Sequence, residues 1–191
     1  MTAVVVLFLA AQTGAWGAIF TWNGGGGDGL WETAANWTLT SGTNEGLAGI
    51  PDGLDSARIE TAVTVTTPAA GVSVLGLTIT AGATLTLGGN FAVTGATWTA
   101  NQAFYLESTG ITINLNGRNI TAEKTHFGID LGSQCGLTVN GLGNFTTTTV
   151  DTNQDANNTV GLYSDAHLII TSGGYLDHTS GSMLFTGDSS S

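Results

Sequence analysis

Short runs in which an apolar residue alternates with threonine or asparagine dominate the chain from residue 58 onward, and they limit its fold more than any other feature. A period of two places alternate side chains on opposite faces of a β-strand, so that one face is buried and the other is solvated. Threonine is β-branched and favours extended backbone. The sequence therefore predicts an all-β protein with strands over residues 62–66, 77–80, 83–87, 111–115, 137–140 and 167–171.

Glycine and asparagine separate these runs, and both residues adopt positive φ at little cost in tight turns. Residues 76–80, 110–114 and 136–140 share a Gly-apolar-Thr-apolar-Thr/Asn pattern, with a degraded copy at 167–171. Irregular recurrence of this kind favours a solenoid with variable turns. We therefore predict a right-handed parallel β-helix with aliphatic residues stacked inside. A β-sandwich is the alternative, because Asn116-Gly117 and Asn140-Gly141 are also typical of β-hairpins.

The segment before the alternating runs has a different composition. Residues 18–56 contain Trp22, Trp31 and Trp37 and a run of glycines, without sustained alternation. Because an open solenoid end exposes unpaired backbone and apolar core, we predict that this segment is an N-terminal cap. The β-helix coils then cover residues 57–191 and continue beyond the end of the chain. The same three tryptophans are candidates for stacking on glycans, since indole faces suit the apolar faces of sugars.

The N-terminus is typical of a secretion signal. Residues 3–11 form an apolar run that is too short to span a bilayer but has the length of a signal-peptide core. Small residues follow at Ala15 and Gly17, the positions that a signal peptidase recognises. We predict a signal peptide over residues 1–17 with cleavage after Gly17, and cleavage after Ala18 as the second choice. A buried first strand is the alternative interpretation.

Charge limits the partners that the chain can bind. The sequence has 3 Lys+Arg against 14 Asp+Glu and a formal net charge of -11. Nucleic acids require clustered basic residues, so we exclude them as partners, together with anionic membranes. The single short apolar run likewise predicts no membrane insertion within this piece. A strongly acidic surface suits an extracellular protein.

The order of motifs in the first half of the chain resembles a known kind of protein. A Trp and a glycine run are followed by a second Trp and then Asn-Trp, over residues 21–37. A Pro-x-x-x-Asp element follows at Pro51–Asp55, and strands of the type 74–79 and 83–87 come next. The ensemble resembles the start of autotransporter-like, repeat-rich bacterial surface exoproteins. The resemblance covers roughly residues 20–95, and it implies a parallel β-helix passenger at the cell surface.

Two groups of acidic residues are candidates for chemistry. Residues 24–29 resemble a calcium-binding Gly/Asp turn, but Asp28 stands one place before the position that the RTX-like pattern requires. We therefore predict no cofactor and no metal site, with calcium near Asp28 as a minor alternative. Paired carboxylates on neighbouring coils could support glycoside hydrolysis or lysis. The candidates for such an acidic cluster are Asp151, Asp155, Asp165 and Asp177.

Threonine pairs form another pattern, with one apolar residue inside each Thr-x-Thr triplet. If Val65, Ile79, Leu85 and Trp98 point inward, each flanking pair points outward on one face. Stacked pairs on a flat face could match an ice lattice, as in β-solenoid ice-binding proteins. The pairs are Thr64/Thr66, Thr78/Thr80, Thr84/Thr86 and Thr97/Thr99.

Taken together, these observations predict an exported, non-enzymatic β-helix module, secreted or held at the surface of a bacterium. It would act as a stalk or adhesin-like surface that contacts extracellular glycans or other cells, and no catalytic residue is assigned. A carbohydrate-active β-helix hydrolase or lyase that uses the acidic cluster is the first alternative, and ice binding through the threonine pairs is the second.

Overall fold

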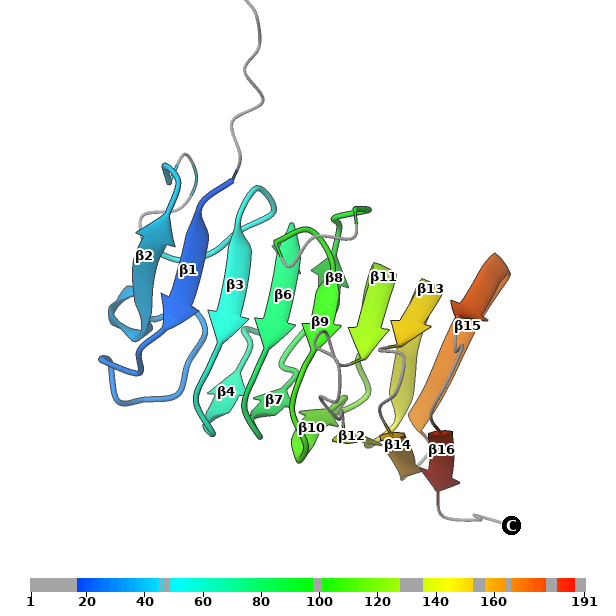
Figure 1. The fold of residues 1–191 in the computed structure, drawn as a ribbon. Coiled ribbons are helices and arrows are strands. Elements are labelled where there is room, and N and C mark those ends of the chain that lie inside the picture. The colour runs from blue at the N-terminus through cyan, green and yellow to red at the C-terminus, as the bar shows by residue number, and fades with distance from the viewer. Residues whose placement is uncertain are drawn as a thin grey trace, which may run out of the picture.

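The protein is all-β, as the alternation predicts, and its strands form two sheets (Figure 1). The structure, a computed structural model, describes residues 17–44, 46, 49–97, 101–127, 136–152, 157–163, 166–177 and 182–187. In these ranges the helical structure is one 3-10 turn, η1 (Ala34–Asn36). The predicted positions Trp98, Asp155 and Asp165 and residues 1–16 of the predicted signal peptide lie outside them.

Sheet A has ten strands in the described residues and sheet B has six. The strands of sheet A are β1 (Ile19–Trp22), β2 (Trp37–Ser41), β3 (Ser56–Ile59), β5 (Val72–Val74), β6 (Gly76–Ile79), β8 (Phe91–Val93), β9 (Phe104–Leu106), β11 (Ile120–Phe127), β13 (Gly143–Thr152) and β15 (Ala166–Asp177). The strands of sheet B are β4 (Thr64–Thr66), β7 (Thr84–Thr86), β10 (Ile111–Asn114), β12 (Gly136–Asn140), β14 (Asn157–Tyr163) and β16 (Ser182–Gly187).

Pairing is parallel throughout both sheets except where β1 meets β2, which is antiparallel. From β3 onward the chain passes alternately through sheet A and sheet B. Each strand therefore pairs with a strand from the next passage through the same sheet, rather than with the next strand in sequence. In Figure 1 the strands of sheet A stand side by side from β2 to β15, and those of sheet B run beneath them. The antiparallel layers of a β-sandwich do not match this pairing.

The predicted hairpin signal at Asn116-Gly117 forms a different turn. Both residues have positive φ, 52° and 74°, as an Asn-Gly turn requires. However, this turn joins β10 in sheet B to β11 in sheet A, and these two strands do not pair with each other. The Gly117 amide instead donates to the Leu142 carbonyl in the next stacked turn, at 2.6 Å. Local turn chemistry was therefore predicted correctly, whereas the hairpin was not formed.

The inward residues of both sheets form one hydrophobic core. Val65, Leu85, Ile113 and Val139 are fully buried and occupy successive register positions of sheet B. Burying each such side chain stabilises the fold by about 1.5–3 kcal/mol. The predicted inward positions Val65, Ile79 and Leu85 are confirmed, each with 0% exposure.

Asparagine ladders connect successive turns outside the core. The Asn90 side-chain oxygen accepts from the Asn119 amide, and the Asn119 side-chain oxygen accepts from the Asn144 amide, both at 3.0 Å. These bonds satisfy the backbone donors of Asn119, just before β11, and of Asn144, near the start of β13. The turns are therefore held in register as well as the strands.

Two segments near the N-terminus lie on the outer edges of the sheets. β2 is the terminal strand of sheet A. On sheet B, Leu30 forms a parallel bridge to Thr66 of the terminal strand β4, with Trp31 N–H donating to the Thr66 carbonyl at 2.9 Å. Residues 29–31 thus cover the first edge of sheet B, while β2 forms the first edge of sheet A. β1 already pairs parallel with β3, so the parallel sheet begins inside the range 18–56.

Candidate functional site

The outward surface of sheet B carries a regular array of polar side chains, which we call the threonine face. One row contains Thr64, Thr84, Thr112 and Thr138, which are Cα partners on β4, β7, β10 and β12. A second row, two residues further along each strand, contains Thr66, Thr86, Asn114 and Asn140. All eight side chains are exposed or half-buried, while the residues between them are fully buried.

Backbone geometry fixes the spacing of this face. Neighbouring strands lie about 4.7–4.9 Å apart, and alternate residues along a strand lie about 6.6 Å apart. The Asn114 side-chain amide donates to the Thr86 hydroxyl at 3.3 Å, and the Asn140 side-chain amide donates to the Asn114 side-chain oxygen Oδ1 at 3.4 Å. The face has no charged residue, so its hydroxyl and amide groups suit a neutral, hydroxyl-rich ligand or ordered water.

The four predicted threonine pairs do not all belong to this face. Thr64/Thr66 and Thr84/Thr86 stack in register, which is the arrangement that ice binding would require. Thr78/Thr80 lies on sheet A, and Thr78 is 3% exposed, so its prediction as part of an exposed pair was wrong. Alternation shows which residues share a side of a strand, but not whether another segment covers that side. Thr97 lies in an exposed loop, and Thr99 lies outside the described residues.

The three candidate glycan-stacking tryptophans are packed together. Trp22, Trp31 and Trp37 are only 4%, 2% and 6% exposed. Their rings meet edge to face, with centroids 4.9 Å apart for Trp22–Trp37 and 4.6 Å apart for Trp31–Trp37. Trp31 also meets the Phe91 ring of β8 at 5.4 Å. Because stacking on a sugar requires a free ring face, this burial favours a packing role for all three.

Asp28 organises the glycine-rich loop beside these tryptophans. Its carboxylate accepts hydrogen bonds from the Thr33 hydroxyl at 2.6 Å, the Asn36 side-chain amide at 2.7 Å and the Leu30 amide at 3.0 Å. Asn36 is fully buried and also accepts from the Gly26 amide at 2.8 Å. The carboxylate oxygens thus have protein donors as partners. Within the described ranges, His, Cys, Asp and Glu side chains form no group of three or more that could hold a metal ion.

These hydrogen bonds predict a pH dependence of stability. The bond from Thr33, followed by those from Leu30 and Asn36, lowers the pKa of Asp28 below its usual value. The charged form therefore stabilises the fold above the unfolded-state pKa, and this contribution is lost as pH falls through the lower, folded-state pKa. We expect Asp28→Asn to unfold at lower urea concentration at pH 7 and to lose less stability than wild type between pH 5 and pH 2. An unchanged acid response in urea titrations would contradict this role.

Two of the four acidic candidates share one register position. Asp151 of β13 and Asp177 of β15 are Cα partners, and Asp151 is also the partner of His126 in β11. The His126 ring lies 5.3 Å from that of Tyr105, its partner in β9. The row therefore brings His126, Asp151 and Asp177 to adjacent strands of sheet A. The other two candidates, Asp155 and Asp165, lie outside the described residues.

A groove that no sequence pattern predicts crosses β8, β11 and β13. It encloses about 380 Å³, and its lining includes Thr94, Thr121, Glu123, Thr146 and Thr148. The Thr148 hydroxyl donates to the Glu123 carboxylate at 3.4 Å. The four consecutive threonines at 146–149 were a signal for this polar surface, but their position beside Glu123 depends on the long-range pairing of β13 with β11.

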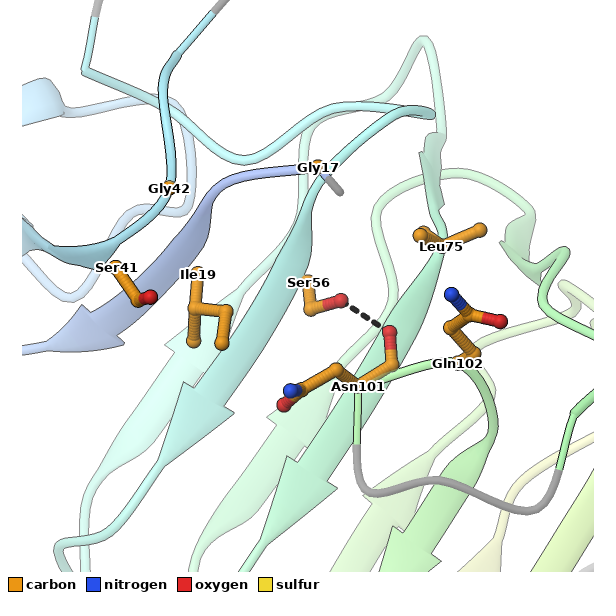
Figure 2. Close-up of a pocket in the computed structure, with 8 residues that line it drawn as sticks. All are labelled: Gly17, Ile19, Ser41, Gly42, Ser56, Leu75, Asn101 and Gln102. Carbon is orange, nitrogen blue, oxygen red and sulfur yellow. Dashed lines mark hydrogen bonds between the residues drawn. The ribbon is translucent and has the colours of Figure 1, made fainter. Parts of the chain in front are cut away.

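A second hollow of about 210 Å³ lies where β1, β2 and β3 approach the loop before β9 (Figure 2). Gly17, Ile19, Ser41, Ser56 and Asn101 are among the residues that line it. The Ser56 hydroxyl donates to the Asn101 carbonyl across one side of this hollow, as the dashed line in Figure 2 shows. Its residues are uncharged, so the hollow presents no acid–base chemistry.

No family model matches the chain, and no curated protein or solved structure is significantly similar to it. In the portion of the chain that the structure describes, no helix is long and apolar enough to cross a bilayer.

Proposed function

We propose that the protein is an exported, non-enzymatic surface module whose threonine face contacts neutral glycans at the exterior of a bacterial cell. The observation that carries this proposal is the threonine face itself. Eight uncharged polar side chains stand in two rows on parallel strands above a fully buried core. Such a surface matches the repeated hydroxyl groups of an extended polysaccharide, and the sheet beneath it keeps the rows in place without further ordering cost.

The architecture that we propose for this module is a right-handed parallel β-helix. Parallel register over successive strands in both sheets supports it, as does the regular passage of the chain from sheet to sheet. Crossovers between parallel strands of one sheet are right-handed in nearly all proteins, which supports the hand. In this architecture residues 18–56 act as the cap. The tryptophan packing and the coverage of the β4 edge by residues 29–31 support that role.

Export rests on the sequence of the N-terminus. The apolar run at 3–11 and the small residues Ala15 and Gly17 favour a cleaved signal, and the net charge of -11 suits an extracellular surface. The resemblance of residues 20–95 to bacterial surface exoproteins supports the same location. A rod that displays an uncharged face would serve there as a stalk or an adhesin-like contact.

Replacing hydroxyls by methyl groups on the face tests glycan binding directly. The triple variant Thr84→Val, Thr112→Val and Thr138→Val keeps side-chain shape and β-propensity while it removes three donors from one row. We expect binding of neutral glycans on an array to fall by about tenfold or more, since each lost hydrogen bond contributes about 0.5–1.5 kcal/mol. Isothermal titration calorimetry with the best array ligand measures the change.

The matched control carries the same substitution at threonines that do not belong to the two rows of the face. Thr43, Thr61 and Thr109 are exposed and lie outside the strands, so their replacement by valine leaves binding unchanged if the face is the site. Equal losses in both variants, or no glycan bound by the wild-type protein, would contradict the proposal. Circular dichroism of both variants verifies that the fold is retained.

Ice binding is a second candidate, favoured by the in-register stacking of Thr64/Thr66 on Thr84/Thr86. The array continues to Thr112 and Thr138, while the second row changes to Asn114 and Asn140. Thermal hysteresis and inhibition of ice recrystallisation test this function. Activity that disappears in the triple valine variant would favour ice over glycan as the ligand.

A carbohydrate-active enzyme is the other alternative, and it would use the acidic row on sheet A. Register places Asp151 beside Asp177 and His126, all on sheet A. Release of reducing sugar from polysaccharides that disappears in Asp151→Asn would favour this alternative over the binding module.

A further inference from the structure

Asp55 is a buried carboxylate that lies next to the start of β1. It is 1% exposed, and its oxygens accept hydrogen bonds from the Ala18 amide at 2.9 Å and the Asp52 amide at 3.3 Å. In the described part of the chain no Lys, Arg or His side chain pairs with it, since the Arg58 guanidinium pairs with Glu60 instead. Aspartate is rarely buried to this extent unless a charge of opposite sign lies beside it.

The closest donor to this carboxylate belongs to a residue with a special place in the sequence. Ala18 is fully buried, and its carbonyl accepts from the Ser56 amide at 2.8 Å, so its backbone is fixed on both sides. Ala18 is also the residue that cleavage after Gly17 would leave as the first of the processed chain. The atom that now donates to Asp55 is therefore the atom that would become a free amine.

We propose that processing at the Gly17–Ala18 peptide bond creates an α-ammonium group that forms a buried ion pair with the Asp55 carboxylate. Water supplies the hydroxyl that completes the Gly17 carboxyl group, and the Ala18 nitrogen takes up the protons that make it an ammonium. The bond broken is the C–N bond between the two residues. This inference rests on the proposed export, because the export signal is what is cut.

The packing around Gly17 places cleavage before folding. A Cβ atom added at Gly17 would lie 1.5 Å from the Leu54 carbonyl oxygen, so the backbone of residue 54 closes that side. Gly42 approaches from another side: a Cβ there would lie 3.0 Å from the Gly17 carbonyl oxygen. In Figure 2 Gly17 stands at the start of the strand that enters the sheet. A peptidase cannot reach a bond held in this way, whereas it can reach the same bond in an unfolded chain during export.

The stability of the uncut chain and that of the cleaved chain should depend on pH in opposite directions. In the uncut chain burial, with a smaller contribution from the nearby charge of Asp52, raises the pKa of Asp55, although amide hydrogen bonds oppose this. In the uncut chain the neutral Asp55 carboxyl therefore stabilises the fold below the unfolded-state pKa of this group. That stabilisation is lost as pH rises through the higher, folded-state pKa. An ammonium beside Asp55 lowers that pKa, so stability instead rises with pH over the acid range. It falls again as the amine deprotonates, above about pH 8.

The test compares three chains that differ only at the N-terminus: one that starts at Ala18, one that starts at Gly17, and one that starts at an Nα-acetylated Ala18. The acetyl group keeps the N–H donor and removes the charge. We expect the Ala18 chain to melt about 5 °C or more above the other two at pH 7, because the other two chains leave the buried Asp55 carboxylate without an opposite charge. Between about pH 4 and pH 6 its melting temperature rises with pH, whereas that of the other chains falls.

Asp55→Asn in all three chains provides the control for charge. It should remove the difference in melting temperature between them. Equal melting of the three wild-type chains, or a difference that survives Asp55→Asn, would overturn the ion pair. N-terminal sequencing of exported protein that begins at Ala18 supports the processing site, and any other first residue overturns it. Retention of the uncut chain inside the producing cell would contradict the proposed export, while the melting comparison would still decide the ion pair.

Discussion

Trp31→Ala should lower the free energy of unfolding by about 3–5 kcal/mol, the range for deletion of a large buried aromatic side chain. Trp31 is 2% exposed and lies between the rings of Trp37 and Phe91, at 4.6 Å and 5.4 Å. Its ring thus joins residues beside the sheet edges to a strand of the parallel sheet. Removing the ring leaves a cavity that the surrounding β-strands cannot close. Urea unfolding followed by circular dichroism measures the loss.

Loss of this ring should also affect association between molecules. The backbone amide of Trp31 donates to the Thr66 carbonyl, and the Thr66 amide donates to the Gly29 carbonyl. Residues 29–31 therefore cover the edge of β4, and the Trp31 ring anchors them to the core. An uncovered edge strand is a template for pairing with another chain. We therefore expect Trp31→Ala to aggregate on storage at concentrations where wild type stays monodisperse. The control is Leu142→Ala at a residue 64% exposed, which should change stability by less than about 0.5 kcal/mol.

The sequence predicted β4, β7, β10 and β12 of sheet B because their signal is local. In β4, β7, β10 and β12 each apolar residue faces the core and each flanking threonine or asparagine faces outward. Alternating burial is a property of one strand, and it needs no knowledge of partners. The inward positions Val65 and Leu85 follow from it and are fully buried.

What the sequence could not predict is the sheet to which a strand belongs. The run at 76–80 shares its pattern with 110–114 and 136–140, yet it forms β6 of sheet A, whereas the other two pair in sheet B. The pattern predicts that alternate residues are buried, which β10 and β12 show, whereas all four residues of β6 are buried. The sheet that a strand joins depends on long-range pairing, such as that of Ser56–Ile59 with Gly76–Ile79. The same limit explains why Thr78 was assigned to an exposed face.

The candidate sites differ in the same way. The threonine face depends on alternation within each strand and on the register between strands. The Thr-x-Thr triplets predict the alternation, whereas the register follows from strand pairing. The Ala18–Asp55 contact joins residues 37 positions apart, and no local pattern marks Asp55 as buried. The groove beside Glu123 likewise arises from the pairing of β11 with β13. Function assigned from this sequence therefore depends on contacts that only the folded chain reveals.

Gly89→Ala should cost about 3 kcal/mol although it adds one methyl group and leaves φ in an ordinary region. A Cβ at Gly89 would lie 2.3 Å from the Gly71 nitrogen and 2.6 Å from both the Ala69 carbonyl oxygen and the Gly71 Cα. All three atoms belong to the backbone of the preceding stacked turn, so no side chain can rotate away. The two turns must move apart, which strains the hydrogen bonds between β5 and β8 on one side of them.

Two further glycines separate this steric cost from the cost of backbone conformation. A Cβ at Gly53 meets nothing closer than the Ser73 hydroxyl oxygen at 3.7 Å, so Gly53→Ala should be neutral or stabilising by up to about 1 kcal/mol. Gly27 has open space but a φ of 71°, so Gly27→Ala should cost about 1–2 kcal/mol. Urea unfolding of the three variants should therefore rank Gly53, Gly27 and Gly89 in order of increasing loss. If Gly89→Ala were as stable as Gly53→Ala, the backbones of successive turns would not be in contact at this position. That result would also contradict the close parallel stacking that aligns the threonine face.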